Sequence, residues 1–105
     1  MAAGQLPILE FDHPEFQPGR NTTVRRGRRW HGVGHARIRW ADGSLSAPLR
    51  LVTELRPFRS LQSHDLAREH DPACRTPEGL LVVLQRLYPG FSPEEEVTLC
   101  HFDLP

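Results

Sequence analysis

Alternating apolar and polar positions predict strands in the first half of the chain. Leu6 to Phe11 is a short apolar stretch that ends before His13-Pro14, where proline offers no backbone donor to a sheet. Residues 21–25 are rich in β-branched side chains, which favour strands. Residues 36–40 alternate strictly between apolar and arginine side chains, as a strand with one buried face does. We therefore expect three strands here.

A tight turn, a further strand and two helices are predicted next. Asp42-Gly43 is typical of a hairpin turn, so the segment from Leu45 to Leu55 should return antiparallel to the third strand. We expect a first helix over residues 60–69. The second helix, over residues 76–88, has the stronger signal, because Thr76-Pro77 suits a helix start and leucines recur at helical spacing.

A final strand over residues 96–102 completes the predicted order, β-β-β-β-α-α-β. Four strands before two helices indicate an α+β fold rather than alternating α/β units. Closure into a small barrel would remove the exposed edges of these strands. We thus expect a single domain over residues 1–105, built as a small β-barrel with two helices.

Length and composition limit the class of protein. A chain of 105 residues suits one domain, and 38% hydrophobic residues are enough for a folded core. No apolar run approaches the roughly 20 residues that cross a bilayer. We expect a soluble, cytoplasmic protein with no membrane partner, in which Cys74 and Cys100 are free thiols.

Charge is unevenly placed, although the formal net charge is zero. The 13 cationic side chains are all arginines, so no side-chain amine can act as a base or nucleophile. Five of them gather in one stretch: Arg20, Arg25, Arg26, Arg28 and Arg29. Guanidinium groups suit phosphate oxygens. The alternative is a solvated face whose arginines pair with Asp12, Glu15 or the acidic run Glu94 to Glu96.

Three segments together resemble an ASCH domain of the PUA-like superfamily. They are residues 18–27 (Pro-Gly-Arg-Asn-Thr-Thr-Val-Arg-Arg-Gly), the helix end 87–90 (Leu-Tyr-Pro-Gly) and the closing strand 97–102. The resemblance implies a β-barrel with a cleft that binds RNA or modified nucleosides. One branch of similar size is an amidohydrolase that deacetylates acetylcytidine with a lysine, a threonine and a glutamate. We expect no cofactor.

The lysine of that branch has no counterpart in this chain. Its motif places the lysine on Arg20 or Asn21, depending on the alignment, and the second threonine on Thr23. Arginine cannot replace lysine as a base, because the pKa of arginine stays above about 12 in proteins. The glutamate would lie just before the long helix, where Glu69 and Asp71 are found. Thr23, Glu69 and Asp71 are therefore the candidate catalytic residues.

Residues near the long helix offer two other chemistries. Thr23 or Cys74 would be a nucleophile beside His70, since a thiol near an imidazole ionises more readily. Zinc is the other option, with His70, Cys74, Cys100 and His101 as ligand types. The spacing lacks the paired Cys-x2-Cys of structural zinc sites, so we expect no metal.

The leading hypothesis is a cleft that binds RNA or a nucleoside-like ligand. Besides Thr23, its expected binding residues are Arg20, Asn21, Thr22, Arg25, Arg26 and Trp30. Asn21 and the threonines would orient the ligand, and the guanidinium groups would supply salt-sensitive affinity. Trp30, rather than Trp40, would stack on a base. The alternatives are a small amidohydrolase acting on an acylated nucleoside or related amide, and a module whose arginines bind an acidic protein.

Overall fold

The computed structural model describes residues 5–12 and 15–105. In chain order its elements are β1 (Ile8–Leu9), β2 (Gly19–Arg26), β3 (His35–Ile38), β4 (Leu49–Arg50), β5 (Val52–Pro57), the short 3₁₀ helices η1 (Phe58–Ser60), η2 (Ser63–Leu66) and η3 (Pro72–Cys74), α1 (Pro77–Leu87) and β6 (Glu96–Leu104). His13 and Pro14, expected to end the first strand, lie outside the described residues. None of the described helices is long and apolar enough to cross a bilayer.

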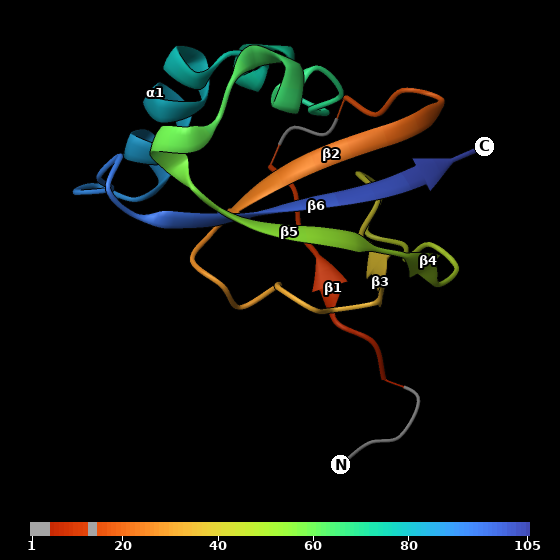
Figure 1. Ribbon diagram of the computed structural model, residues 1–105. Coiled ribbons are helices and arrows are strands. Elements are labelled where there is room, and N and C mark those ends of the chain that lie inside the picture. Colours follow the sequence, from red (N-terminus) through yellow and green to blue (C-terminus); the bar gives the residue numbers. More distant parts are fainter. Residues whose placement is uncertain (1–4, 13–14) are drawn as a thin grey trace.

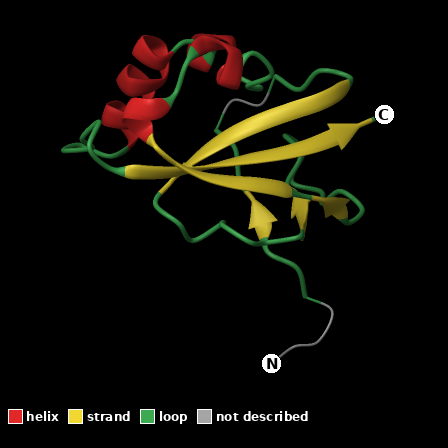
Figure 2. Cartoon of the chain, viewed as in Figure 1, coloured by secondary structure: helices red, strands yellow, loops and turns green. Residues whose placement is uncertain are grey.

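The elements form three layers. The middle layer is a sheet in the order β2-β6-β5, and a second sheet has the order β1-β3-β4. Figure 1 shows α1 and the 3₁₀ helices over one face of the middle sheet, with β1, β3 and β4 on its other side. Figure 2 shows the same separation by element type, with all helices on one side. The middle sheet therefore contributes to two cores.

β6 joins these cores because both of its faces are buried. It pairs antiparallel with β2 on one side and with β5 on the other. Val97 and Leu99 are buried in the core shared with α1, whereas Cys100 and Phe102 are buried in the core shared with β1 and β3. Successive side chains of a strand point to opposite faces, so one strand supplies both cores in turn.

α1 confirms the predicted second helix and its start. Thr76 Oγ1 accepts a hydrogen bond from the N–H of Gly79 at 3.1 Å, and Leu80 and Leu84 form the buried stripe. Gly79 lies directly against η3, since a Cβ at this position would be 2.1 Å from the carbonyl oxygen of Ala73. The absence of a side chain at Gly79 allows the helix to pack closely on η3.

The hairpin predicted at Asp42-Gly43 is also confirmed. The N–H of Trp40 donates to the carbonyl of Ser44 at 2.8 Å, and the N–H of Gly43 donates to the carbonyl of Trp40 at 2.9 Å. Gly43 has a φ of 88°, which glycine adopts without the strain that other residues incur. The chain returns so that β4 pairs antiparallel with β3.

The helix predicted over residues 60–69 is wrong. The chain forms two short 3₁₀ helices, η1 and η2, in and before this region. Gln62 and Asp65 cap η2 reciprocally, which favours one short turn. Leu61 and Leu66 are 5% and 0% exposed, but side chains five positions apart do not share one helical stripe. Two short turns allow both leucines to reach the same core.

The prediction of a closed barrel is wrong as well, because the structure has two open sheets of three strands each. Residues 27–34 contain no strand, so β2 and β3 do not pair. At Leu51 the chain leaves the second sheet at the end of β4 and enters the middle sheet as β5. The fold is α+β, with one α-helix among the described residues and two separate sheets.

Candidate functional site

The segment that contains Glu69 lies along the outer edge of β2. The N–H of Thr22 donates to the carbonyl of Arg68 at 2.8 Å, and the carbonyl of Thr22 accepts from the N–H of His70 at 3.0 Å. These bonds form a parallel bridge between Thr22 and Glu69. They bring the candidate glutamate next to Thr23, although 46 positions separate the two residues in the chain.

A cavity of about 440 Å³ opens where this edge meets α1 and the residues after β1. Its volume lies in the range of small-molecule sites. Phe11 and the side chains of α1 supply its apolar walls. Its central polar lining comes from β2 and from the segment before α1, and consists of Thr23, Arg25, Glu69, His70 and Asp71. All three candidate catalytic residues are therefore present.

Arg25 is fixed in the cavity wall by three contacts. Its Nε donates to Thr23 Oγ1 at 3.2 Å, and its Nη2 donates to the carbonyl oxygen of Glu10 at 2.9 Å. The guanidinium carbon lies 4.8 Å from the centre of the Phe11 ring, a distance typical of cation–π contacts. Burial lowers the pKa of Arg25. The group remains a cation because the ordinary arginine pKa is far above neutrality.

Glu69 is a buried acid that can exchange a proton near neutral pH. Only 2% of the residue is exposed. Burial raises the pKa of Glu69 to about 7, and the Asp71 carboxylate adds to the rise, while hydrogen bonds from the Asp71 and Val24 amides and the charge of Arg25 oppose it. The Asp71 amide is 3.0 Å from Glu69 Oε1. Both protonation states of Glu69 are thus populated at neutral pH, as general acid–base chemistry requires.

His70 is held as a neutral ring beside this acid. Its Nε2 lies 3.2 Å from Glu69 Oε1, and its ring packs edge-on against Phe11 with the ring centres 4.7 Å apart. Burial lowers the pKa of His70 to about 4, and the charge of Arg25 contributes. Within the described residues, His70 Nδ1 is a buried atom without a hydrogen-bond partner. We assign the tautomer that carries its proton on Nε2, which donates to Glu69 and leaves Nδ1 bare.

The two thiols lack the properties of a nucleophile. Burial raises the pKa of Cys74 to about 12 and that of Cys100 to about 11. Cys74 Sγ contacts Asp71 Oδ2 at 3.8 Å rather than His70. Both cysteines are free and lie in different cores. Across residues 5–12 and 15–105, no group of three His, Cys, Asp or Glu side chains is arranged so that it could hold a metal ion, and His101 contacts Glu54 instead of the cysteines.

Most of the predicted arginine face is occupied by internal carboxylates. The ion pairs are Arg20–Asp103 at 2.9 Å, Arg26–Glu95 at 2.7 Å and Arg28–Glu96 at 2.6 Å. Glu95 and Glu96 belong to the acidic run near the end of the chain. The alternative prediction, that the arginines pair with this run on a solvated face, is therefore confirmed for Arg26 and Arg28. Exposed pairs of this kind contribute little to stability. The arginine stretch is therefore spread over the surface, and only Arg25 enters the cavity wall.

Three other predicted ligand residues are buried away from solvent. Asn21 is fully buried and donates to the carbonyls of Gln17 and Gly19. Thr22 is 1% exposed, and its hydroxyl bonds the ring of His101. Trp30 is 9% exposed in the core between the sheets. The turns around Trp30 fold its indole inward, so this ring is not free to stack on a base.

Two aromatic residues of the cavity, Phe11 and Tyr88, are not among the residues predicted from the sequence. The apolar pattern predicts only a place in the first strand for Phe11, whereas Phe11 lies beyond β1 and contacts both Arg25 and His70. Tyr88, at the C-terminal end of α1, also lines the cavity. The Tyr-Pro-Gly sequence predicts the end of the helix and is the one sequence signal that points to Tyr88.

Comparison of the chain with protein-family models, curated proteins and solved structures gives no match. The geometry of the cavity and the chemistry of its side chains therefore carry the functional argument.

Proposed function

We propose that this protein binds a nucleoside-like ligand in the cavity between β2 and α1. The observation that carries the proposal is that Thr23 and Arg25 of one segment meet Glu69 and His70 of another around a single cavity. Its volume of about 440 Å³ suits a ligand the size of a nucleoside. The resemblance of residues 18–27 to the ASCH motif points to the same class of ligand.

The side chains of the cavity offer complementary contacts to a planar, amide-bearing ring. Arg25 is a donor for a ring carbonyl, and Glu69 is a donor or an acceptor according to its protonation state. Phe11 and Tyr88 provide aromatic surface in the lining of the cavity. Because contacts to Thr23 and to the backbone already hold Arg25, binding orders little more of the protein, which favours affinity.

The charges of the cavity favour a free nucleoside over a nucleic-acid strand. Its lining contains the carboxylates of Glu10, Asp12 and Asp71 together with the guanidinium groups of Arg25 and Arg86. A strand needs a track of cations along its phosphates. Arg20, Arg26 and Arg28 do not offer such a track, because each of them is paired with a carboxylate. Affinity should accordingly depend only weakly on salt.

Calorimetric titration with a panel of ribonucleosides and with an RNA oligonucleotide tests the proposal. Arg25→Gln should weaken nucleoside binding by about tenfold or more, since hydrogen bonds to charged groups are worth about 1.5–3 kcal/mol. Arg20→Gln is the matched control on the same strand, because Arg20 pairs with Asp103 and does not line the cavity. The affinity of this variant should stay within about twofold of the wild type. The proposal is wrong if no nucleoside binds at millimolar concentration, or if both variants lose affinity equally.

The second candidate function is hydrolysis of an amide on such a ligand, and the position of Glu69 favours it. As a carboxylate, Glu69 would take the proton of the Thr23 hydroxyl while the Thr23 oxygen attacks the amide carbon, and as an acid it would return that proton to the amine as the C–N bond breaks. Water would then hydrolyse the acyl ester on Thr23 and restore its hydroxyl. Arg25 Nε donates to Thr23 Oγ1, which leaves the hydroxyl hydrogen free for transfer. The pKa of about 7 suits both steps.

A screen of acetylated nucleosides separates hydrolysis from binding alone. Thr23→Ala and Glu69→Gln should abolish turnover, and Cys74→Ala should retain it, because the buried Cys74 thiol has a pKa of about 12. If the wild type binds nucleosides but turns over none of these substrates, hydrolysis is excluded for them and binding remains the function.

A further inference from the structure

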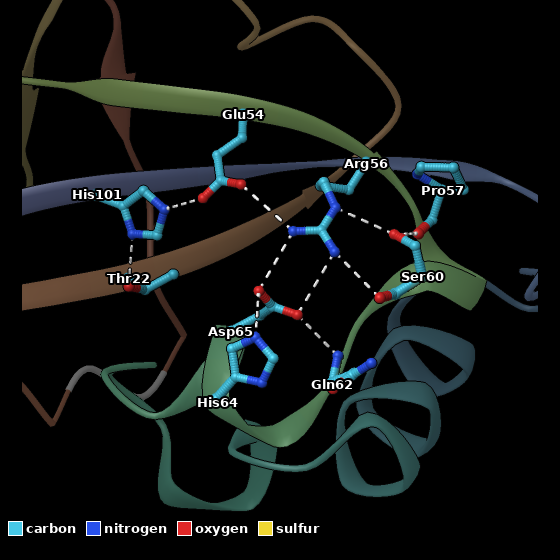
Figure 3. Close-up of polar contacts among 9 residues, drawn as sticks. All are labelled: Thr22, Glu54, Arg56, Pro57, Ser60, Gln62, His64, Asp65 and His101. Carbon is cyan, nitrogen blue, oxygen red and sulfur yellow. Dashed lines mark hydrogen bonds and ion pairs between the residues drawn. The ribbon is translucent and has the colours of Figure 1, made fainter.

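A continuous chain of polar side chains runs across the middle sheet from β2 to η2 (Figure 3). Its members, in order, are Thr22, His101, Glu54, Arg56 and Asp65. The contacts between successive members measure 2.8, 2.9, 3.4 and 3.3 Å. We refer to these five side chains as the polar chain. It joins four elements, β2, β6, β5 and η2.

The first three members have the residue types of a hydroxyl–imidazole–carboxylate triad. Thr22 Oγ1 lies 2.8 Å from His101 Nδ1, and His101 Nε2 lies 2.9 Å from Glu54 Oε2. Thr22, however, is 1% exposed, so its hydroxyl cannot reach a substrate. This arrangement therefore serves to hold structure in place rather than to attack a ligand.

Both ends of the polar chain are attached to the segment that leads to Glu69. At one end, Asp65 accepts from the N–H of Gln62 at 2.9 Å and fixes the start of η2. At the other end, the backbone of Thr22 bonds Arg68 and His70, on either side of Glu69. The segment from residue 62 to residue 70 is thus held at its beginning and at its end by one connected network.

We propose that the polar chain positions Glu69 and His70 in the cavity, with Glu54 as its junction. This inference rests on the proposed function, because it assigns positioning residues to the same cavity. Glu54 is the junction because one of its oxygens contacts His101 and the other contacts Arg56. Its side chain is 43% exposed, whereas the side chains of His101 and Asp65 are 13% and 14% exposed.

Three substitutions distinguish the contact between Thr22 and His101 from the contacts that Glu54 makes with His101 and Arg56. Glu54→Ala removes the junction. His101→Asn places an amide near the Nδ1 position and retains the contact with Thr22, whereas His101→Gln reaches the Nε2 position and retains only the contact with Glu54. Asp103→Asn is the control, since it breaks an exposed ion pair on the same strand.

Two readouts on the ligand-free protein report position rather than overall stability. One is the titration midpoint of the Glu69 carboxyl carbon in NMR spectra, and the other is hydrogen exchange of the His70 amide. The groups that surround Glu69 are unchanged in every variant, namely Arg25, His70, Asp71, Cys74 and Arg75. A change in the midpoint therefore reports movement or hydration of the segment.

Glu54→Ala and His101→Gln should lower the Glu69 midpoint by at least half a pH unit, because a released segment admits water to the carboxyl group. They should also accelerate exchange of the His70 amide at least tenfold. His101→Asn should have a smaller effect on the Glu69 midpoint and on exchange of the His70 amide, and Asp103→Asn should affect neither of these readouts. The proposal is overturned if both readouts match the wild type, if only the melting temperature falls, or if Asp103→Asn gives the same changes. If Glu54→Ala does not fold, Glu54→Gln replaces it in the same measurements.

Nucleoside titration of the same proteins distinguishes this inference from the proposed function. The expected result is affinity about tenfold weaker in Glu54→Ala and His101→Gln, and unchanged affinity in Asp103→Asn. If the wild type binds no nucleoside while the Glu69 midpoint still moves, the proposed function fails and the positioning role stands. If all variants bind like the wild type and the midpoint is fixed, the positioning role fails and the proposed function stands.

Discussion

Exchange of Glu69 or His70 for glutamine should give pH dependences of stability that have opposite signs. The pKa of Glu69 is raised from 4.5 to about 7 by burial, and the pKa of His70 is lowered from 6.5 to about 4, also by burial. Each value departs from that of the unfolded chain by about 2.5, and each pKa unit corresponds to about 1.4 kcal/mol. Each group alone is therefore linked to about 3 kcal/mol of unfolding free energy.

In the wild type these two contributions should nearly cancel. Between pH 4.5 and 6.5 the folded protein has a protonated, neutral Glu69 and a neutral His70 ring. The unfolded chain has an ionised Glu69 and a protonated His70, so it holds the same number of protons. Because the slope of stability with pH follows the difference in bound protons, this pair contributes little slope in that interval.

Each substitution reveals the contribution that remains. Glu69→Gln leaves His70, whose lowered pKa gives stability that is present above pH 6.5 and is lost as the pH falls towards 4. His70→Gln leaves Glu69, whose raised pKa gives stability that is present below pH 4.5 and is lost as the pH rises through 7. The unfolding free energy of Glu69→Gln minus that of the wild type should rise by about 3 kcal/mol between pH 4.5 and 7, where the wild type loses the contribution of Glu69. The same difference for His70→Gln should fall by about 3 kcal/mol between pH 4 and 6.5, where the wild type gains the contribution of His70.

Urea denaturation of the three proteins between pH 4 and 8 measures these slopes. Free energies of unfolding are compared as differences from the wild type at each pH, because Asp65 and Glu95 also have lowered pKa values and titrate at acidic pH in all three proteins. Slopes of the same sign in the two variants, or differences that do not vary with pH, would refute the assignment of the proton to Glu69.

Three further predictions concern the framework of the site. Gly79→Ala should lower the urea midpoint even though alanine is favoured over glycine in helices by about 1 kcal/mol, because the new Cβ would meet the Ala73 carbonyl at 2.1 Å; an equal or higher midpoint contradicts this packing. Cys74 and Cys100 should resist a thiol reagent at pH 8 until the protein is unfolded, since burial raises the pKa of both; rapid labelling of the folded protein would disprove it. Thr76→Ala should cost about 1 kcal/mol in thermal unfolding by loss of the helix cap, and Thr76→Asp should retain stability.

The elements predicted correctly from the sequence depend on neighbours in the chain. Thr76 and the leucines that follow are sufficient for α1, because the cap, the proline and the apolar stripe all act within 12 positions. The same holds for the Asp42-Gly43 turn. The helix predicted over residues 60–69 is wrong because Leu61 and Leu66 indicate burial, but a spacing of five positions does not match the period of a helix.

The site itself depends on contacts between distant parts of the chain. The bridge that brings Glu69 beside Thr22 joins positions 47 apart, and nothing local to either residue specifies it. Arg26 and Arg28 find their carboxylates 69 and 68 positions away, so the sequence offered this pairing only as one alternative and did not show which arginine meets which carboxylate. The raised pKa of Glu69 is likewise a consequence of burial by the folded chain.

The central claim is that Thr23, Arg25, Glu69 and His70 form one site for a nucleoside-like ligand. The measurement that tests it most directly is a nucleoside titration followed in amide NMR spectra of the labelled protein. We expect shifts confined to residues 22–25, 69–71 and 80–88, with little change on raising the salt concentration. Shifts confined to the exposed ion pairs of Arg20, Arg26 and Arg28, or none at millimolar nucleoside, would contradict it.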